Sequence, residues 1–160
     1  MKRELWSLPD EGEHIWFLGS LVTIKIPGEA VGGRCTLIEF LAPRGLSPPL
    51  HSHPQDETFT LIDGAVTFVA GDQRFLCETG ASWIVPRGIT HTFRVESETM
   101  RLVAVYAPAG MDHCFREAGL PAARPTLPPA DAPTRPLEEI EEAMRTHGHD
   151  NFGPPLGPDD

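Results

Sequence analysis

Two histidines and a glutamate lie close together in the segment HSHPQDE, residues 51–57. On a β-strand, the side chains of residues i and i+2 project from the same face, so His51 and His53 point toward one target. If the chain bends after the second histidine, the carboxylate of Glu57 reaches that same side. Two imidazoles and a carboxylate would then form part of a metal site.

A fourth candidate ligand is His91, which follows a turn, PRG, and begins a new β-prone run. Two β-hairpins can close the stretch of chain between Glu57 and His91, so three imidazoles and one carboxylate could converge. Such a nitrogen-rich set suits divalent iron, manganese, cobalt, nickel, copper or zinc, whereas calcium and magnesium prefer oxygen ligands. Four protein ligands would leave room on an octahedral metal for a substrate and for O₂ or water.

The elements that must position these residues are short strands between residues 15 and 107. Turns rich in glycine and proline separate the β-prone runs, and no long amphipathic helix interrupts them. Asp63 and Gly64 are expected to join two of the strands as a tight hairpin. Many short strands at regular spacing predict an all-β sandwich or barrel. The candidate strands read HIWFLG, LVTIKI, RCTLIEFLA, ETFTLID, AVTFVA, QRFLCE, SWIVP, HTFRV and MRLVAVYA.

After Ala107 the composition changes. A short helix is expected within residues 108–122, ending at Gly119, and the proline-rich stretch that follows, to residue 136, is expected to be an extended connector. The segment PLEEIEEAMRTHG predicts a second helix, with acidic residues early and Gly148 as its end. Its apolar stripe should dock on the outside of the barrel or on a second subunit, and it comprises Leu137, Ile140 and Met144.

His147 and His149 flank Gly148 near the end of the second predicted helix. A glycine at a helix end favours helix termination over a metal site at this HGH sequence. Residues 151–160 are expected to be loosely held. The three cysteines are far apart without a CxxC pair, so reduced thiols are expected.

The stretch GLSPPLHSHPQDETFTLIDG, residues 45–64, resembles the first conserved motif of the cupin superfamily at every fixed position. The stretch GASWIVPRGITH, residues 80–91, resembles the second, although Val95 stands where that motif usually ends in asparagine. The resemblance implies a double-stranded β-helix, or jelly-roll barrel, with one divalent transition metal. The implied metal ligands are His51, His53, Glu57 and His91.

Over most of residues 15–156, the sequence is similar to bacterial single-domain cupins described as quercetin 2,3-dioxygenase-like. This likeness implies a cupin β-barrel domain at residues 1–110, with its motifs at 45–64 and 80–95. Residues 111–160 would form a helical, proline-rich extension packing on the barrel or on a partner.

The function implied by this likeness is a metal-dependent dioxygenase acting on an aromatic or enolisable hydrophobic small molecule, with O₂ as a possible co-substrate. Glu57 is the candidate catalytic residue, because a carboxylate at the metal could accept the proton of a substrate hydroxyl. Strand alternation places further apolar side chains inside the barrel, where they are equally candidates for the core. The candidate substrate pocket comprises Phe59, Leu61, Phe93 and Phe40.

Two other functions remain open. The same metal set could catalyse a non-redox isomerisation, or the cyclisation of a polyketide-like substrate, by polarising an enolate. The barrel could also be a non-catalytic module that binds a small molecule. A shared fold does not decide among these reactions.

Charge and composition restrict the partners. The net charge of −10 disfavours nucleic acid and anionic membrane surfaces, because no stretch rich in Lys and Arg is present to neutralise phosphates. The first residues contain no apolar leader segment and the chain has no apolar run long enough to span a membrane, so a cytoplasmic protein is expected. A homodimer is the expected assembly, because an open jelly roll leaves strand edges to be covered.

Overall fold

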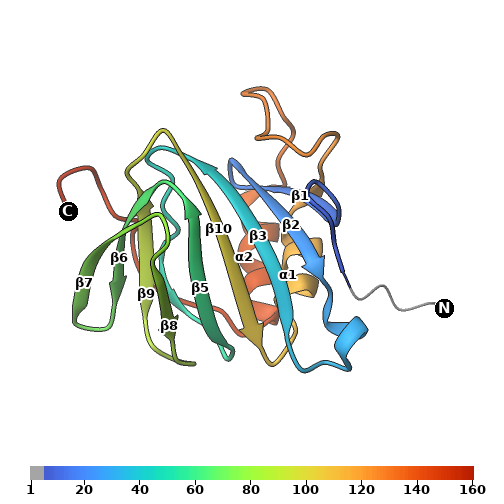
Figure 1. Ribbon diagram of the computed structural model, residues 1–160, viewed down its shortest axis with the longest axis horizontal. Helices are drawn as coiled ribbons and strands as arrows, with labels where there is room; N and C mark the ends of the chain where they lie inside the picture. The colour runs from blue at the N-terminus through green and yellow to red at the C-terminus, as the bar shows by residue number, and fades with distance from the viewer. Residues whose placement is uncertain (1–5) are drawn as a thin grey trace.

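The structure is a computed structural model that describes residues 6–160. Twelve strands, two α-helices and one 3₁₀ helix (η1) follow one another along this part of the chain (Figure 1). In chain order they are β1 (Glu13–Phe17), β2 (Ser20–Ile26), η1 (Gly28–Val31), β3 (Thr36–Pro43), β4 (Leu50–Ser52), β5 (Asp56–Asp63), β6 (Ala65–Ala70), β7 (Gln73–Glu78), β8 (Ser82–Val85), β9 (His91–Val95), β10 (Thr99–Ala107), α1 (Met111–Ala118), β11 (Leu120–Pro121), α2 (Leu137–Thr146) and β12 (Asp150–Gly153).

The strands form two antiparallel sheets. The larger sheet has the order β11-β1-β2-β3-β10-β5-β8, and the smaller has the order β12-β4-β9-β6-β7. Strands that are consecutive in sequence therefore often lie in different sheets, as in a double-stranded β-helix. The predicted all-β jelly-roll class with short C-terminal helices is confirmed.

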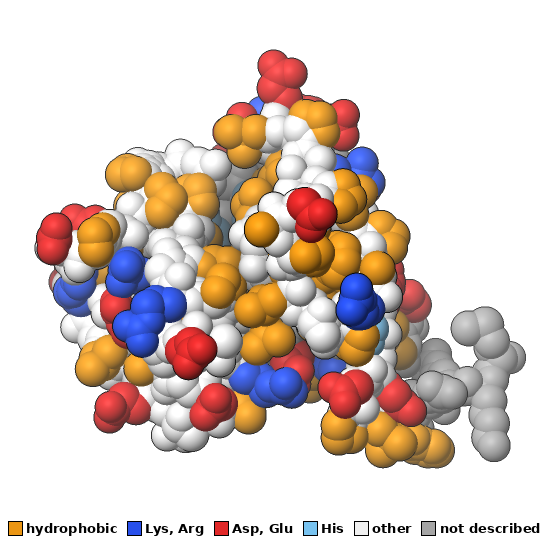
Figure 2. Space-filling view, turned by 90° about the horizontal axis from the view of Figure 1, so that it is seen from above, with side chains coloured by type: hydrophobic (Ala, Val, Ile, Leu, Met, Phe, Trp, Pro, Cys, Tyr) orange, Lys and Arg blue, Asp and Glu red, His pale blue; other side chains and the backbone are white. Residues whose placement is uncertain are grey.

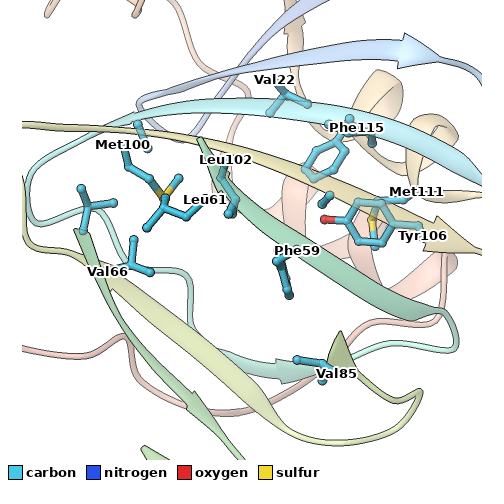
Figure 3. Packing of buried hydrophobic residues seen from close by; sticks show 14 of the residues in the cluster. Val22, Phe59, Leu61, Val66, Val85, Met100, Leu102, Tyr106, Met111 and Phe115 are labelled. Atoms are coloured by element: carbon cyan, nitrogen blue, oxygen red, sulfur yellow. The ribbon is translucent and has the colours of Figure 1, made fainter. Parts of the chain in front are cut away.

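Strict alternation of buried and exposed residues builds the core. Along β10, every second residue from Met100 to Tyr106 is buried, and the inward positions of β5 are Glu57, Phe59 and Leu61. A period of two is the signature of a strand with one face against a core. Figure 3 shows the apolar side chains of β5 and β10 meeting others from β2, β6, β8 and α1 between the two sheets.

The predicted hairpin at Asp63 and Gly64 is wrong. β5 pairs with β10 and β8, whereas β6 pairs with β7 and β9, so the chain crosses between sheets at this point. Gly64 has a φ of 106°, and a β-carbon there would lie 2.5 Å from the Ser97 hydroxyl and 2.6 Å from the Thr99 carbonyl oxygen. The glycine marks a crowded corner that no other residue could fill without a shift.

The C-terminal helices continue the core beyond the smaller sheet, and Figure 1 shows them behind β2 and β3. Phe115 of α1 lies edge-on to Phe40 of β3, with ring centroids 5.6 Å apart. In α2, Ile140 is buried and Met144 packs partly buried beside it, but Leu137 is 64% exposed. The predicted stripe therefore docks through its later residues only.

The end of the chain is more ordered than expected. Residues 150–153 form β12, which pairs with β4 and brings Asn151 opposite His51. The expectation of a loosely held tail is thus wrong for the start of residues 151–160, because the unpaired edge of β4 offers hydrogen-bonding groups that the tail satisfies.

None of the helices in the described part of the chain is both long and apolar enough to cross a bilayer. Cys35, Cys77 and Cys114 form no disulfide. On the face shown in Figure 2, hydrophobic, acidic and basic side chains are intermixed.

Candidate metal centre

The four predicted ligands come from three neighbouring parts of the barrel. His51 lies on β4 and His91 begins β9, and these two residues are direct cross-strand partners in the smaller sheet. His53 lies in the connection after β4, while Glu57 lies on β5 in the larger sheet. The site is therefore built where the two sheets face each other, which the spacing within one motif cannot show.

The three histidines form a compact cluster. One ring nitrogen from each of His51, His53 and His91 lies within 4.8 Å of the other two. Their ring centroids are 4.3 Å apart for His51 and His91, 4.9 Å for His53 and His91, and 5.8 Å for His51 and His53. His53 and His91 are buried, and His51 is partly buried.

Each of these three rings is hydrogen-bonded through Nδ1 to a backbone carbonyl oxygen. Nδ1 of His51 lies 2.7 Å from the carbonyl oxygen of Pro49, and Nδ1 of His91 lies 2.9 Å from that of Ile89. For His53 the partner is the carbonyl oxygen of Gln55, at 3.1 Å. A carbonyl can only accept, so each Nδ1 carries a proton, and a neutral ring then has its lone pair on Nε2. This is the arrangement in which imidazoles bind a metal.

Glu57 completes the cluster from the opposite sheet. Its Oε2 lies 2.9 Å from Nε2 of His53 and 3.1 Å from Nε2 of His91, and the residue is only 3% exposed. Two nitrogen lone pairs and a carboxylate oxygen repel one another unless a cation, either a proton or a metal, lies among them. The donor set thus fits a divalent transition metal, with Glu57 contacting two of the three histidines.

The charges in the cluster follow from burial and from these contacts. Burial raises the pKa of Glu57, but the contacts with His53 and His91 outweigh it and lower that pKa to about 2. Burial and the neighbouring His91 lower the pKa of His51 to about 4. For His91, burial lowers the pKa, yet the contacts with Glu57 raise it above its ordinary value. Metal binding requires an ionised carboxylate and neutral imidazoles. Near neutral pH Glu57 and His51 are in these states, whereas the contact with Glu57 favours a proton on His91 that a bound metal would displace.

Tyr106 is a site residue that the sequence interpretation missed. It is the cross-strand partner of Glu57 in the pairing of β10 with β5, and its ring centroid lies 5.8 Å from that of His53. Burial and the negative charge of Glu57 raise the pKa of its phenol well above the ordinary value, so it is a neutral donor. The alternation of side chains along MRLVAVYA is a signal that could place this residue on the inward face. Only the register of the strands sets it beside Glu57.

His149 is the second missed residue, because HGH was interpreted as a helix end. Its ring centroid lies 5.8 Å from that of His51 and 5.3 Å from that of His53, and the residue is 7% exposed. Burial, together with the positive charge that His53 and His51 can carry, lowers its pKa to about 3. No local signal could have found it, since its position depends on the pairing of β12 with β4.

The predicted pocket residues occupy different surroundings. Phe59 is buried and stacks on Trp83, with ring centroids 5.1 Å apart. Phe68 lies against Phe59 and stacks at 6.1 Å on His91 and at 6.2 Å on Phe93, so it connects these aromatic residues to the histidine cluster. The remaining two pocket candidates belong to the core, Leu61 being fully buried and Phe40 lying against α1.

Comparisons with known proteins cover much of the chain. Residues 37–106 match the model of the Cupin domain family. Quercetin 2,3-dioxygenase of Bacillus subtilis is 25% identical over 134 residues, which cover 83% of this chain. The same alignment covers 40% of that enzyme, so this chain spans well under half of its length.

Solved structures resemble the chain in fold. KdgF from Halomonas sp. superposes with a TM-score of 0.60 at 15% identity, over 67% of this chain and 97% of that one. An RmlC-like cupin from Shewanella frigidimarina superposes with a TM-score of 0.59 at 16% identity, over 68% of this chain and 95% of that one. At these identities the likeness shows the fold alone.

Proposed function

We propose that this protein, whose chain has the cupin double-stranded β-helix fold, is a metal-dependent enzyme of the dioxygenase type. Its metal ligands would be His51, His53, His91 and Glu57, one divalent transition metal being bound per chain. Its substrate would be an aromatic or otherwise enolisable hydrophobic small molecule.

The orientation of the three imidazoles carries the proposal of a metal. Each ring has its Nδ1 proton committed to a backbone carbonyl, and Nε2 of His53 and of His91 faces the Glu57 carboxylate. When these rings are neutral, their lone pairs face a carboxylate with no donor between them, which is costly for buried acceptors. A divalent metal would satisfy the nitrogen and oxygen acceptors together.

The reaction type rests on two further points. The likeness to quercetin 2,3-dioxygenase spans most of this chain, and aromatic side chains reach the cluster through Phe68 on His91. A redox-active metal here would act as a Lewis acid for an enolate and would exchange electrons with O₂. The aromatic wall would hold a flat substrate and exclude water, and Glu57 would take the proton of the substrate hydroxyl on a carboxylate oxygen.

One observation also favours a non-redox reaction at the same site. Glu57, an ionised carboxylate, has the neutral phenol of Tyr106 as its cross-strand partner. A proton acceptor and a proton donor side by side suit the transfer of a proton within an enolisable substrate, as in an isomerisation or cyclisation. Dependence on oxygen separates this second candidate from the first.

The experiment is oxygen uptake by the apo-protein reconstituted separately with Fe(II), Mn(II), Co(II), Ni(II) and Cu(II). Each sample is given a flavonol and a small panel of other enolisable aromatics, and His91→Ala serves as the control. Uptake that requires both a metal and His91 is the expected result. Samples that hold one metal per chain and consume no oxygen with any compound would leave the non-redox reaction as the better candidate.

A separate measurement tests whether the barrel only binds its ligand. Compounds from the same panel are titrated into wild-type protein and into metal-free His91→Ala. Isothermal calorimetry measures the affinity of each protein for each compound. The proposed enzyme is expected to lose binding in His91→Ala. Undiminished binding without metal would favour a non-catalytic module.

A further inference from the structure

Backbone hydrogen bonds on both sides of His149 hold the C-terminal segment against the candidate metal centre. Before it, helix α2 ends in a Schellman motif, in which the backbone N–H of Gly148 donates to Arg145 and that of His149 donates to Met144. After it, β12 pairs with β4 and sets Asn151 opposite His51. The backbone on either side of His149 is thus hydrogen-bonded, and its side chain has a defined direction.

Gly148 makes this direction possible. Its φ is +83°, the left-handed conformation that glycine adopts without strain. A β-carbon at this position would lie 3.1 Å from Cγ and Cδ of Pro54, the residue that follows the ligand His53. The helix end therefore lies directly on the loop that carries a metal ligand.

The side chain of His149 is buried and has no hydrogen-bond partner within the described residues. It is 7% exposed, and neither Nδ1 nor Nε2 has a donor or acceptor within reach. The ring is nearly parallel to that of His51, with an interplanar angle of 17°, and lies 5.3 Å from that of His53. A buried imidazole with two unsatisfied nitrogens indicates a missing partner at this place.

His149 differs from the three histidines among the candidate ligands in two ways. Its ring nitrogens do not belong to the group of nitrogens that lie within 4.8 Å of one another. Its Nδ1 also makes no bond to a backbone carbonyl, whereas Nδ1 of each of the other three does. The ring is therefore not pre-oriented as a metal ligand, and it keeps one donor and one acceptor for another molecule.

We propose that His149 is a ligand-binding residue of this site, whose imidazole hydrogen-bonds the hydroxyl, enolate or small anion that binds to the metal. The inference rests on the proposed function, because it assumes a metal at His51, His53, His91 and Glu57. It adds a residue from the C-terminal segment to a site that the two barrel motifs otherwise build. Residues 148–153 then lie along one side of the site.

The test uses the full chain loaded with Co(II), whose visible absorption reports both metal binding and changes in coordination. Azide is the probe, as a small anion that accepts hydrogen bonds. His149→Phe keeps an aromatic ring of similar size and removes both nitrogens, and His147→Phe is the matched control. His147 lies two residues away and contacts Glu117 of α1, at 3.0 Å.

The expected result separates metal affinity from anion affinity. His149→Phe should bind Co(II) within about 2-fold of wild type and should bind azide about 10-fold more weakly, which is the effect of losing one hydrogen bond. His147→Phe should change neither. His149→Gln, which keeps a donor and an acceptor, should recover part of the azide affinity.

Three outcomes would overturn the inference. Unchanged azide affinity in His149→Phe would show that the ring does not touch the bound anion. A large loss of Co(II) affinity in His149→Phe would make His149 a metal ligand instead. Failure of wild-type protein to bind Co(II) would refute the proposed function as well, whereas the first two outcomes would leave that proposal intact.

A measurement on wild-type protein covers the case in which His149→Phe does not fold. Zn(II)-loaded protein with ¹⁵N-labelled histidine is titrated with azide and followed by NMR. Azide is expected to shift the imidazole ¹⁵N resonances of His149 and not those of His147. Identical resonances of His149 with and without saturating azide would contradict the inference.

Discussion

The carbonyl oxygens of Pro49, Gln55 and Ile89 matter as much to the candidate metal centre as the histidines do. They fix the tautomer of each ring, so that three lone pairs face inward before any metal arrives. Each carbonyl lies two residues from its histidine. The spacing of the motif therefore encodes the orientation of each ligand as well as its identity.

Glu57→Gln is expected to weaken metal binding by about 100-fold, because it replaces the only negative charge contributed by the proposed ligands. Asp56→Asn is the matched control, since Asp56 is the preceding residue but pairs with Arg87 at the surface, at 2.7 Å. It should change metal affinity by less than about 3-fold. Calorimetric titration with Mn(II) or Co(II) measures both, and equal losses would argue against Glu57 as a ligand.

Asp112 is expected to stabilise the fold from a position away from the metal. It is fully buried and accepts hydrogen bonds from the Gly28 backbone N–H at 3.0 Å and from the Thr36 hydroxyl at 3.2 Å. Burial raises its pKa, but these bonds, with His113 and Arg116 nearby, lower it below the ordinary 3.8. Asp112→Asn should cost about 1–3 kcal/mol at pH 7, because an amide cannot accept both bonds as well.

The pH dependence of that cost follows from the lowered pKa. A carboxyl group whose pKa is lower in the folded state stabilises the protein above its unfolded pKa and loses that effect as the pH falls through its folded pKa. Urea unfolding should show that the free energy of unfolding of wild type exceeds that of Asp112→Asn by a constant amount above about pH 5. This difference should shrink below about pH 4. The exposed Asp72→Asn should show no such difference, and a pH-independent gap for Asp112→Asn would contradict the assignment.

Among the elements, the segment from α2 to β12 links the C-terminal extension to the site. Ile140 and Ala143 bury one face of α2 against Ala118 of α1, and β12 then completes the edge of the smaller sheet beside β4. The extension is thus attached by a hydrophobic contact at one end and by strand pairing at the other. A substitution that distorts the turn between α2 and β12 should therefore weaken both the helix packing and the strand pairing.

Gly148→Ala tests that turn, with Gly19→Ala as its control. The two glycines have φ values of +83° and +84°, but a β-carbon at Gly19 would meet nothing within 4 Å, whereas one at Gly148 meets Pro54. Both substitutions should cost about 1–2 kcal/mol for the left-handed conformation. Gly148→Ala should cost about 1 kcal/mol more for crowding. Equal losses in the free energy of unfolding, measured with urea, would mean that Pro54 moves away from the added β-carbon without cost.

At the scale of the whole molecule, the two halves of the barrel differ in how their sheet edges are covered. The helices lie at one end, whereas β7 and β8, the outermost strands of their sheets, lie in the other half (Figure 1). Leu76 on β7 is 62% exposed and Ile84 on β8 is 61% exposed. Exposed apolar residues on open strand edges are typical of surfaces that pair with another chain.

A homodimer formed through this end of the barrel is the assembly we propose. Sedimentation velocity is expected to give twice the mass of one chain for wild type and a single chain for Leu76→Glu combined with Ile84→Glu. Leu137→Glu is the control, because Leu137 is 64% exposed on α2, among the helices. A monomeric wild type at micromolar concentration would refute the proposal, and dissociation by Leu137→Glu would relocate the interface.

The sequence by itself determined most of the strands and the residues of the candidate metal centre. Strand alternation and turn residues are local signals with a fixed period, so β10 and the inward face of β5 could be read directly from the chain. The histidines and Glu57 could be chosen by residue type and spacing, because metal chemistry restricts which side chains can serve. These predictions needed no knowledge of which strands lie side by side.

Only the tertiary structure decided which strands pair and what else reaches the site. The chain turns a corner at Gly64 instead of forming a hairpin, Tyr106 lies beside Glu57, and His149 lies over the histidine cluster. Each depends on contacts between segments far apart in sequence, such as β12 with β4. Such pairing is chosen by the packing and hydrogen bonding of the whole barrel, which leaves no periodic trace in any one segment.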